Sequence, residues 1–338
     1  MQECKIAVIG ATGAVGRVFL NILEERNFPA TSIRLCGKTS VGTNLKVMGE
    51  NITVEEVTPK LLSEVNLAFI SATTSVSKEV APLASAQGAV VIDDSSAFRM
   101  DPKVPLVVPE VNVEALETHQ GIISIPNCST TPLVMLLKPL NAINPVQRVI
   151  ADTYQSVSGT GAAAVKEMKA QSSDILQNKP VKSDVYPHQI AFNLIPHIDD
   201  FHDNGYSNEE MKLILETRKI MENPDLKISA TCVRVPVSIG HSESVHIGLS
   251  SHMSATEARS ILESAPGIRV LDDPRDSVYP MPIVAEGQDD VYIGRIREDL
   301  SERNGITAWI VSDNLRKGAG LNAIQIAEEL LVRDLMHL

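Results

Sequence analysis

The stretch Lys5–Gly16, KIAVIGATGAVG, indicates how the first part of this 338-residue chain folds. The apolar run that ends at Ile9 is typical of a strand buried on both faces, and a glycine-rich turn follows it directly. Apolar residues then recur with helical spacing at Val15, Val18, Phe19, Ile22 and Leu23. This order favours a dinucleotide site, because glycines let a pyrophosphate approach the N–H groups at the helix N-terminus. The alternative is a tight turn that binds nothing.

Further apolar runs continue the pattern of strands that alternate with helices. Val65–Ala72 and Ala89–Ile92 are predicted strands, and Val76–Ala86 between them is a predicted helix. Such alternation predicts an α/β domain of the Rossmann-like type with a parallel sheet. The loop Asp93–Arg99 follows a strand at the edge where such sheets bind ligands. Arg99 is therefore a candidate anion ligand, and a surface ion pair is the alternative.

The loop after the second predicted strand, Ile33–Cys36, bears on the choice of cofactor. NAD-binding folds usually carry an acidic residue about 20 residues beyond the glycines, where it binds the ribose hydroxyls. This chain instead has Gly37, Lys38, Thr39 and Ser40 there. A cation and two hydroxyls suit the additional phosphate of NADP, so the sequence favours NADP over NAD. The alternative is a solvated polar loop.

The stretch Ser124–Leu140, SIPNCSTTPLVMLLKPL, contains a candidate nucleophile, Cys128. A strand-like segment, Gly121–Ile125, precedes it, and the proline at position 132 marks the first turn of an apolar helix. A cysteine at such a bend lies near the positive end of the helix dipole, which favours the thiolate. The residue type also fits a buried structural cysteine, and this stretch alone does not decide between the two.

After Cys128 the predicted strands become longer and alternate less regularly with helices. A helix is predicted to begin near Ala162, after the loop Ser156–Gly161, and the segment Gly318–Leu338 is predicted to be the last helix. The pattern predicts a second, α+β domain with a mixed sheet. The predicted strands are Arg148–Gln155, Lys227–Ser250, Asp290–Arg297 and Ile306–Val311.

One helix of this second domain has a clear N-terminal signal. Ser207 and Glu210 have the spacing of a capping box and predict a helix that runs through Met221. Met211, Ile214 and Leu215 are predicted to form its inner face. The other face is predicted to carry Lys212, Glu216 and Lys219, whose spacing is typical of ion pairs on a solvated helix.

The strand prediction over Lys227–Ser250 also orients an arginine. Val233, Val235 and Val237 alternate with polar neighbours, so Arg234 is predicted to point away from the valine face. His241 follows a short break in this pattern. By itself the pattern around His241 favours a core histidine whose hydrogen bonds are satisfied.

Length and composition exclude several kinds of partner and site. A chain of 338 residues predicts two domains, and a net charge of −12 argues against nucleic acid or an anionic membrane as the main partner. The four cysteines are widely spaced, without the close pairs of a zinc or redox site, so no metal is predicted. The N-terminal apolar run is too short for a signal peptide, and no run approaches the ~20 apolar residues of a membrane span. These features predict a reduced, cytoplasmic protein.

Several motifs, taken together and in order, resemble the aspartate-semialdehyde dehydrogenase family over nearly the whole chain. They are GATGAVG (10–16), DDSSAFRMD (93–101), PLVVPEVN (105–112), PNCSTTP (126–132), TYQSVSGTG (153–161), FNLIPHID (192–199), CVRVPVSIGHSES (232–244) and DNLRKGAGLNAIQIAE (313–328). The resemblance implies reductive dephosphorylation of L-aspartyl-4-phosphate to L-aspartate-4-semialdehyde with NADPH, through a cysteine thioester. This reaction lies on the route to lysine, methionine and threonine. The implied partners are the small-molecule substrate, phosphate and a second or further copies of the chain, in a homodimer or tetramer.

The resemblance also implies a role for individual residues. Cys128 is the implied nucleophile, His241 the acid/base, and Gln155 the residue that positions substrate and thioester. Arg234 would bind the substrate carboxylate and Glu216 its amino group. The implied phosphate ligands are Arg99, Lys219 and Asn127. The implied cofactor positions are Thr12, Gly13, Ala14, Val15, Ser158, Gly159 and Asn314, beside Gly10, Gly16, Lys38, Thr39 and Ser40 from the loops described above.

One departure from the family concerns the loop that meets the 2′-phosphate of NADP. The family commonly has Arg-Ser there, whereas this chain has Thr39-Ser40 next to Lys38. The resemblance further implies that the last helix returns to the nucleotide domain. The expected domains are therefore 1–127 plus 315–338 for NADP, and 128–314 for catalysis and dimerisation. Two alternatives stay open, namely an enzyme like N-acetylglutamyl-phosphate reductase, whose cysteine usually follows Pro-Gly and precedes Tyr-Pro-Thr, and a non-catalytic paralogue.

Overall fold

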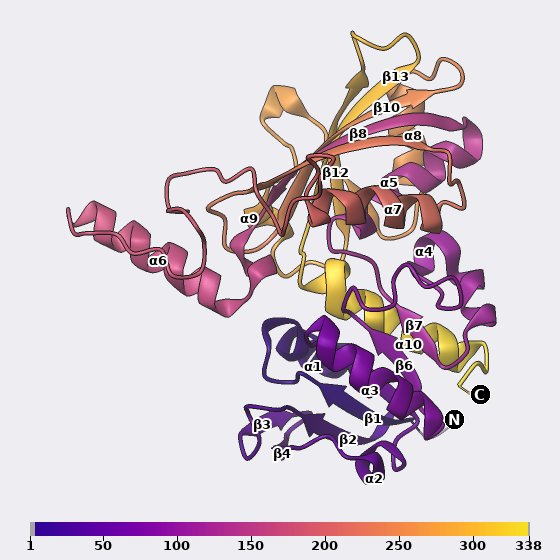
Figure 1. The fold of residues 1–338 in the computed structure, drawn as a ribbon. Coiled ribbons are helices and arrows are strands. Elements are labelled where there is room, and N and C mark those ends of the chain that lie inside the picture. Colours follow the sequence, from indigo (N-terminus) through magenta and orange to yellow (C-terminus); the bar gives the residue numbers. More distant parts are fainter. Residues whose placement is uncertain (1–3, 337–338) are drawn as a thin grey trace. The chain divides into compact units, whose positions relative to one another are not determined.

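The computed structural model describes residues 4–336 and divides the chain into two compact units (Figure 1). Unit 1 comprises Met1–Asn127 and Ala319–Leu338, and unit 2 comprises Cys128–Gly318. The last boundary falls between residues 318 and 319, slightly later than the expected 314/315. The difference arises because the turn after residue 312 packs within unit 2, where the side chain of Asn314 accepts a hydrogen bond from Gly240 N.

Unit 1 contains a seven-stranded sheet in the order β3-β4-β2-β1-β5-β6-β7. All neighbouring strands are parallel except β3 and β4, which form a hairpin. The strands are β1 (Cys4–Ile9), β2 (Ala30–Cys36), β3 (Asn44–Val47), β4 (Glu50–Glu55), β5 (Leu67–Ile70), β6 (Val90–Asp93) and β7 (Ile122–Ser124). The helices are α1 (Ala14–Glu25), α2 (Pro59–Leu62), α3 (Thr74–Ala86), α4 (Pro109–Asn112), the 3-10 helix η1 (Val113–Thr118) and α10 (Leu321–Val332).

Successive residues of β1 are buried on opposite faces of this sheet. Ile6 and Val8 pack in one cluster with α1 and α10, and Ala7 and Ile9 pack in another with α2 and α3. Burial on both faces explains why the strand reads as a continuous apolar run. The sheet with helices on both faces confirms the predicted Rossmann-like α/β architecture.

Unit 2 contains a six-stranded mixed sheet in the order β11-β12-β13-β10-β8-β9, which confirms the predicted second architecture. Helices α5, α7 and α8 pack against its strands. The strands are β8 (Val146–Gln155), β9 (Lys227–Arg234), β10 (His241–Leu249), β11 (Ile268–Val270), β12 (Val291–Glu298) and β13 (Gly305–Ser312). The helices are α5 (Thr130–Ile143), η2 (Val157–Thr160), α6 (Ala162–Leu176), α7 (Asn208–Ile220), α8 (Ala255–Glu263), η3 (Pro274–Asp276) and α9 (Pro282–Ala285), and the π-helix η4 (Arg316–Gly320) leads out of the unit.

The predicted strand Lys227–Ser250 is in fact two strands, β9 and β10, separated by residues 235–240. Pro236 has no backbone N–H to give to a ladder, and Gly240 has a left-handed backbone with φ 93°, so the ladder stops here. The predicted alternation therefore holds only as far as Arg234. That residue is 6% exposed and lies on the same face of β9 as buried Cys232.

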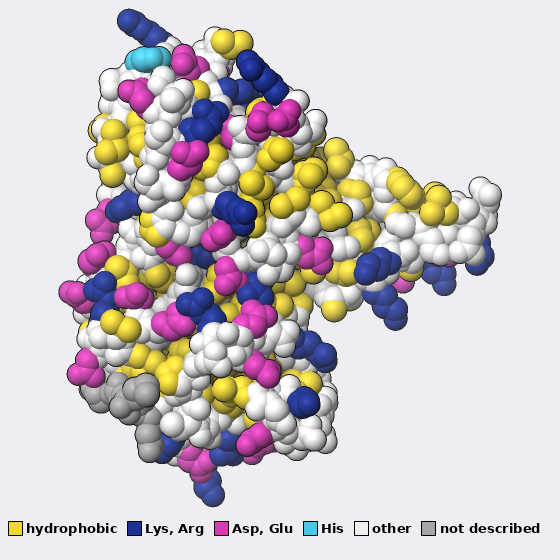
Figure 2. Space-filling model, turned by 180° about the vertical axis from the view of Figure 1, so that it is seen from behind, with side chains coloured by type: hydrophobic (Ala, Val, Ile, Leu, Met, Phe, Trp, Pro, Cys, Tyr) yellow, Lys and Arg dark blue, Asp and Glu magenta, His cyan; other side chains and the backbone are white. Residues whose placement is uncertain are grey.

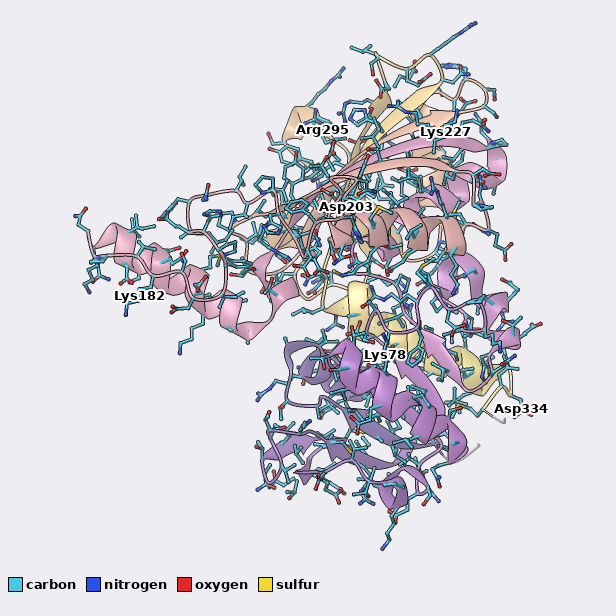
Figure 3. The ribbon with its side chains drawn as sticks, in the orientation of Figure 1. Lys78, Lys182, Asp203, Lys227, Arg295 and Asp334 are labelled. Carbon is cyan, nitrogen blue, oxygen red and sulfur yellow. The ribbon has the colours of Figure 1, made fainter. Side chains whose placement is uncertain are left out.

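Helix α6 forms an arm that stands away from the sheet of unit 2 (Figure 1). The chain returns along this helix through the segment that includes Lys182 (Figure 3). The side chain of Gln171 holds the return, because its Nε2 donates to Lys182 O at 2.8 Å and its Oε1 accepts from Ile190 N at 2.9 Å. Glu167 Oε2 accepts from Asp184 N at 2.6 Å in the same way.

The last helix is shorter than predicted. Helix α10 ends at Val332, and Asp334 then takes a left-handed backbone with φ 57°, which cannot continue a right-handed helix. The predicted end at residue 338 lies outside the described residues.

Candidate active site

The glycine-rich turn of unit 1 leaves backbone N–H groups open at the start of α1. Gly10 has φ 88°, and a Cβ there would lie 2.0 Å from Ser71 O. A Cβ on Gly16 would lie 2.3 Å from Gly10 O. Glycine is therefore required at both positions. The N-cap residue of α1 is Gly13, which makes no side-chain cap, so the N–H groups of the first turn fit a dinucleotide pyrophosphate.

The loop after β2 lies against this turn. Thr12 Oγ1 donates to Ser40 Oγ at 3.1 Å, which joins the two loops. Lys38 and Thr39, which precede Ser40 in the loop after β2, are exposed. The structure thus joins the loop that carries the predicted cation and hydroxyls to the glycine turn through Ser40.

Two other predicted site residues also belong to unit 1. Arg99 is 7% exposed, and its guanidinium donates to Asp94 O at 2.7 Å, which fixes the side chain in the loop after β6. Asn127 is 7% exposed and is the last residue of the unit before Cys128.

Cys128 differs from the other cysteines in its exposure. All four cysteines lie within residues 4–336, and Cys128 is the one that is partly exposed. Burial raises the pKa of the Cys4 thiol to about 11 and that of Cys36 to about 12, and burial also raises the pKa of Cys232. Those three thiols therefore stay protonated at neutral pH, whereas Cys128 lies just before the first turn of α5, where the helix dipole favours a thiolate.

The polar residues of unit 2 form a row across one face of its sheet. Gln155 of β8 pairs with Arg234 of β9, and His241 of β10 pairs with Ser312 of β13. Because β8 and β10 are adjacent, the four side chains lie side by side. Gln155, Arg234 and His241 are all buried, at 1%, 6% and 1% exposure. The backbone of Gly159 covers the row, since a Cβ there would lie 3.1 Å from Arg234 Nη1 and 3.3 Å from His241 Nε2.

The hydrogen bonds of His241 show which ring nitrogen carries its proton. Ser156 N donates to His241 Nδ1 at 3.0 Å. A backbone N–H can only donate, so Nδ1 accepts and a neutral ring carries its proton on Nε2. Burial and the nearby charge of Arg234 lower the pKa of His241 to about 3, so the ring is neutral at neutral pH. Its Nε2 is buried without a partner among the described residues, and the Nε2–H group is thus ready to donate to a ligand.

Helix α7 presents carboxylates to this row. Glu209 Oε1 accepts from Gln155 Nε2 at 2.9 Å, and Glu210 Oε1 accepts from Cys232 N at 3.0 Å. The predicted capping box is confirmed, with Glu210 Oε2 accepting from Ser207 N at 2.7 Å. Lys212 Nζ lies 3.3 Å from Glu209 Oε2.

The predicted faces of α7 are wrong in part. Ile214 is buried as predicted, but Met211 and Leu215 are only half-buried. Glu216, predicted on the solvated face, is 1% exposed. The hydrophobic pattern did not predict the buried carboxylates, because α7 packs on a polar part of the sheet. Groups of that sheet donate hydrogen bonds to carboxylates of the helix. Glu216 lies two turns beyond Glu209, about 10 Å further along the axis.

Ser158 and Asn314, predicted at the cofactor, lie behind the row. Asn314 Nδ2 donates to Ser158 Oγ at 3.0 Å, and both residues are buried. A further buried acid, Glu243, lies two residues along β10 from His241 on the same face. Neither oxygen of Glu243 has a partner among the described residues, and burial raises the pKa of this carboxyl well above its usual range. Burial thus favours the protonated, neutral form of Glu243.

Comparisons with known proteins agree with this architecture. The family model described as semialdehyde dehydrogenase, NAD binding domain, matches residues 5–119, and the one described as semialdehyde dehydrogenase, dimerisation domain, matches residues 137–317. The aspartate-semialdehyde dehydrogenase of Bacillus subtilis (strain 168) is 50% identical over 334 residues, which cover 96% of each chain. That of Aquifex aeolicus (strain VF5) is 49% identical and covers 98% of each.

The chain belongs to the aspartate-semialdehyde dehydrogenase family.

Solved structures of this family have the same fold. The aspartate semialdehyde dehydrogenase II of Vibrio cholerae, complexed with ASA, superposes with a TM-score of 0.96 at 42% identity over 99% of each chain. The enzyme of Candida albicans, with NADP, gives a TM-score of 0.77 at 26% identity over 98% of this chain and 99% of that one.

Within this family fold, the predicted site residues fall into two sets. The glycine turn, Lys38–Ser40, Arg99 and Asn127 belong to unit 1. The structure brings together in unit 2 the residues Gln155, Ser158, Gly159, Arg234, His241 and Asn314.

Two members of the cluster in unit 2 were not predicted, Ser156 and Glu209. Ser156 follows Gln155 in the motif TYQSVSGTG (153–161). Glu209 and Lys212 have the same i,i+3 spacing as Glu216 and Lys219. The spacing of Glu209 and Lys212 was the available signal, but Glu216 and Lys219 have the same spacing and the resemblance favoured that pair.

In residues 4–336 no helix has the length and apolarity needed to cross a bilayer. The same part of the chain holds no group of three or more histidine, cysteine or acidic side chains placed to bind a metal ion.

Proposed function

We propose that the chain converts L-aspartyl-4-phosphate and NADPH into L-aspartate-4-semialdehyde, phosphate and NADP, as an enzyme of lysine, methionine and threonine biosynthesis. The relatives from Bacillus subtilis and Aquifex aeolicus are named aspartate-semialdehyde dehydrogenases. The observation that carries the proposal is the buried row of Gln155, Arg234 and His241 in the unit that begins with Cys128. The likeness to this family disfavours the two alternatives, an N-acetylglutamyl-phosphate reductase and a non-catalytic paralogue.

Cys128 is the proposed nucleophile. Its thiolate attacks the acyl carbon, and the bond from carbon to the phosphate oxygen breaks. Phosphate departs, and the acyl group remains on the sulfur as a thioester. Bound NADPH supplies the hydride that reduces this thioester. The carbon–sulfur bond then breaks, which releases the aldehyde and restores the thiolate. The N–H groups at the start of α5 lie next to Cys128 in the chain and are proposed to stabilise the oxyanion.

His241 is the proposed donor to the oxygen that becomes negative in each addition step. Its ring is neutral, and Nε2, which carries the proton, is buried without a partner among the described residues. An oxyanion that collapses to a carbonyl needs a hydrogen bond and no net proton, so a neutral imidazole suffices. The base role that the resemblance implies needs the proton on Nδ1, where Ser156 N–H already points.

Arg234 is the proposed ligand of the substrate carboxylate. Its Nη1 donates to Ser156 O at 2.8 Å, and its Nε is buried without a partner among residues 4–336. The edge formed by Nε and Nη2 can therefore donate two parallel hydrogen bonds to a carboxylate. Lysine has no such edge.

The substrate amino group has two candidate carboxylates. The resemblance points to Glu216, and the contact with Gln155 favours Glu209. We propose Glu209, because it is joined to the row that holds the other substrate ligands. For the phosphate, Arg99, Lys219 and Asn127 are proposed by resemblance, and Lys212 is the cation paired with Glu209.

NADP is the proposed cofactor of unit 1. The glycine turn fits its pyrophosphate, and the Candida albicans structure contains NADP. Thr12–Val15 line the turn, Lys38–Ser40 face the 2′-phosphate, and Ser158, Gly159 and Asn314 are proposed at the nicotinamide end.

We expect the Lys38→Met variant to lose affinity for NADP but not for NAD. A charge-assisted hydrogen bond to phosphate contributes about 1.5–3 kcal/mol, so the KM for NADP should rise roughly 10-fold to 100-fold. Steady-state oxidation of aspartate semialdehyde with phosphate and each cofactor measures this. Lys60→Met, at another exposed lysine of unit 1, is the matched control.

The same assay tests the proposed function. Oxidation of aspartate semialdehyde with NADP, and not of N-acetylglutamate semialdehyde, is the expected result. A chain that oxidises neither aldehyde would be the non-catalytic paralogue, and a preference for NAD would remove Lys38 from the phosphate site.

The proposed assembly is a homodimer formed through unit 2, whose family model is a dimerisation domain. Large hydrophobic side chains are exposed in this unit, and Figure 2 shows such side chains gathered near the base of the arm. Examples of exposed large hydrophobic residues are Leu176, Phe192, Leu194 and Ile283. A tetramer is the further proposal. The cytoplasm is the proposed location, where the nicotinamide cofactors and amino-acid precursors of this reaction are found.

A further inference from the structure

The turn Asp313–Gly318, which follows β13, contacts both chain segments that hold His241. Asn314 is 2% exposed, and its Oδ1 accepts from Gly240 N at 2.9 Å and from Ser156 Oγ at 3.1 Å. Gly240 directly precedes His241, and Ser156 N donates to Nδ1 of the ring. The side-chain oxygen of Asn314 thus binds both Gly240, which precedes His241, and Ser156, which fixes the tautomer of the His241 ring.

The other end of the turn lies against the nucleophile. A Cβ on Gly318 would lie 2.9 Å from Cys128 Cβ and 3.3 Å from Cys128 Cα. Gly318 therefore provides the backbone surface on which Cys128 rests, and any larger residue must displace one of the two.

The turn is itself held by the side chain of Asp313. Its Oδ1 accepts from Leu315 N at 2.8 Å and from Arg316 N at 3.1 Å, while its Oδ2 accepts from Gly287 N at 2.8 Å. Gly318 N donates to Asp313 O at 3.2 Å. These bonds connect the Asn314 end and the Gly318 end through a short closed turn.

We infer that Asp313–Gly318 is a positioning segment that sets the sulfur of Cys128 and the ring of His241 in place relative to each other, with Asn314 fixing the ring and Gly318 fixing the sulfur. This inference rests on the proposed function for the roles of Cys128 and His241. Reacting groups must be held to a fraction of an ångström, and a misplacement of about 1 Å costs roughly 100-fold in rate.

Asn314 also matters because it is uncharged. The charged groups that act on His241 are Arg234 from β9 and Glu209 from α7, and burial of Glu243 on the same strand raises its pKa and so disfavours a further charge there. The isosteric substitution Asn314→Asp keeps an acceptor for Gly240 N and Ser156 Oγ but adds a negative charge. Ser156 Oγ lies 3.0 Å from His241 Nδ1 and donates to residue 314 Oδ1, so the new carboxylate would lie only one hydroxyl group away from the ring. The variant therefore favours the imidazolium.

The first test is histidine-labelled ¹⁵N NMR of the full-length chain without substrate. His241 signals are identified by their loss in His241→Gln. In the unsubstituted chain we expect a pyrrole-type Nε2 and a pyridine-type Nδ1, with no titration between about pH 8 and pH 5. In Asn314→Asp we expect the ring to titrate within that range.

The matched control is Asn144→Asp. Asn144 is also buried, at 5% exposure, but its side chain bonds to Ser250 and Ser251. This variant should leave the His241 signals unchanged. A proton on Nδ1 in the unsubstituted chain, or a His241 ring in Asn314→Asp that behaves as before, would overturn the inference.

The second test addresses the other end of the turn. Gly318→Ala should lower kcat by about 10-fold to 100-fold and change the rate at which iodoacetamide alkylates Cys128, with NADP binding retained. Gly248→Ala is the matched control, because the nearest atom to its Cβ is 3.5 Å away. Unchanged kcat and alkylation in Gly318→Ala would contradict the inference. NMR and alkylation need no turnover, so they separate a failure of the positioning segment from a failure of the proposed reaction.

Discussion

Replacing Cys128 with alanine is expected to abolish turnover, with kcat falling by more than about 10⁴-fold while NADP still binds. In the proposed reaction the acyl group is bonded to this sulfur, and the other three thiols are buried with raised pKa values. None of them can therefore replace the thiolate at neutral pH. Steady-state kinetics with aspartate semialdehyde, phosphate and NADP measures the loss, and calorimetry measures NADP binding.

Cys232→Ala is the control for this variant. Cys232 lies on β9, two residues from Arg234, and is 1% exposed. Its removal leaves a small cavity and is expected to lower stability without a comparable loss of kcat. A Cys128→Ala enzyme with a rate near normal would remove this residue from the mechanism.

The next largest effect is expected for Glu209→Gln, with the KM for aspartate semialdehyde rising roughly 10-fold to 100-fold. Glu209 is 6% exposed and accepts from Gln155 Nε2, so an amide in its place removes a charge-assisted hydrogen bond. Such a bond contributes about 1.5–3 kcal/mol. The lost carboxylate is also the proposed partner of the substrate amino group. The KM and kcat for each variant come from the same assay.

Glu216→Gln is the matched variant, because it makes the same chemical change one heptad away on the same helix. We expect a smaller rise in KM than for Glu209→Gln. If Glu216→Gln instead gave the larger rise, the amino-group contact would move to Glu216, as the resemblance implies.

The sequence predicted the fold well where local patterns and burial agree. The run Lys5–Gly16 predicted a strand, a turn and a helix, and β1, the glycine turn and α1 follow in that order. The spacing of Ser207 and Glu210 predicted the start of α7, because a capping box is a local signal. Such features need only neighbours in the chain, which is why they could be read without the structure.

Features that depend on distant contacts could not be predicted. The sequence predicted a solvated face of α7 where the structure has buried carboxylates. Nothing in the sequence of the helix indicates that a polar sheet lies beneath it. The hairpin of β3 and β4 was missed, since its short strands are mostly polar and exposed at the sheet edge.

The environment of His241 is the clearest case of information that only the fold supplies. Its tautomer depends on Ser156, 85 positions away in the chain, and its support depends on Asn314, which is 158 positions from Ser156. Contacts between residues so far apart in the chain produce no periodic pattern in the sequence. The resemblance implied a role for His241, and its hydrogen bonds and burial support the proposal that it acts as a neutral donor.

The central claim, that an acyl group is carried by the sulfur of Cys128, is tested most directly by trapping that group. The chain is incubated with aspartate semialdehyde and NADP without phosphate, so that hydride transfer occurs but the thioester has no phosphate to accept the acyl group. Peptide mass spectrometry should then locate an aspartyl adduct on Cys128. An adduct on any other residue, or NADPH formation with an unmodified Cys128 throughout, would contradict the account.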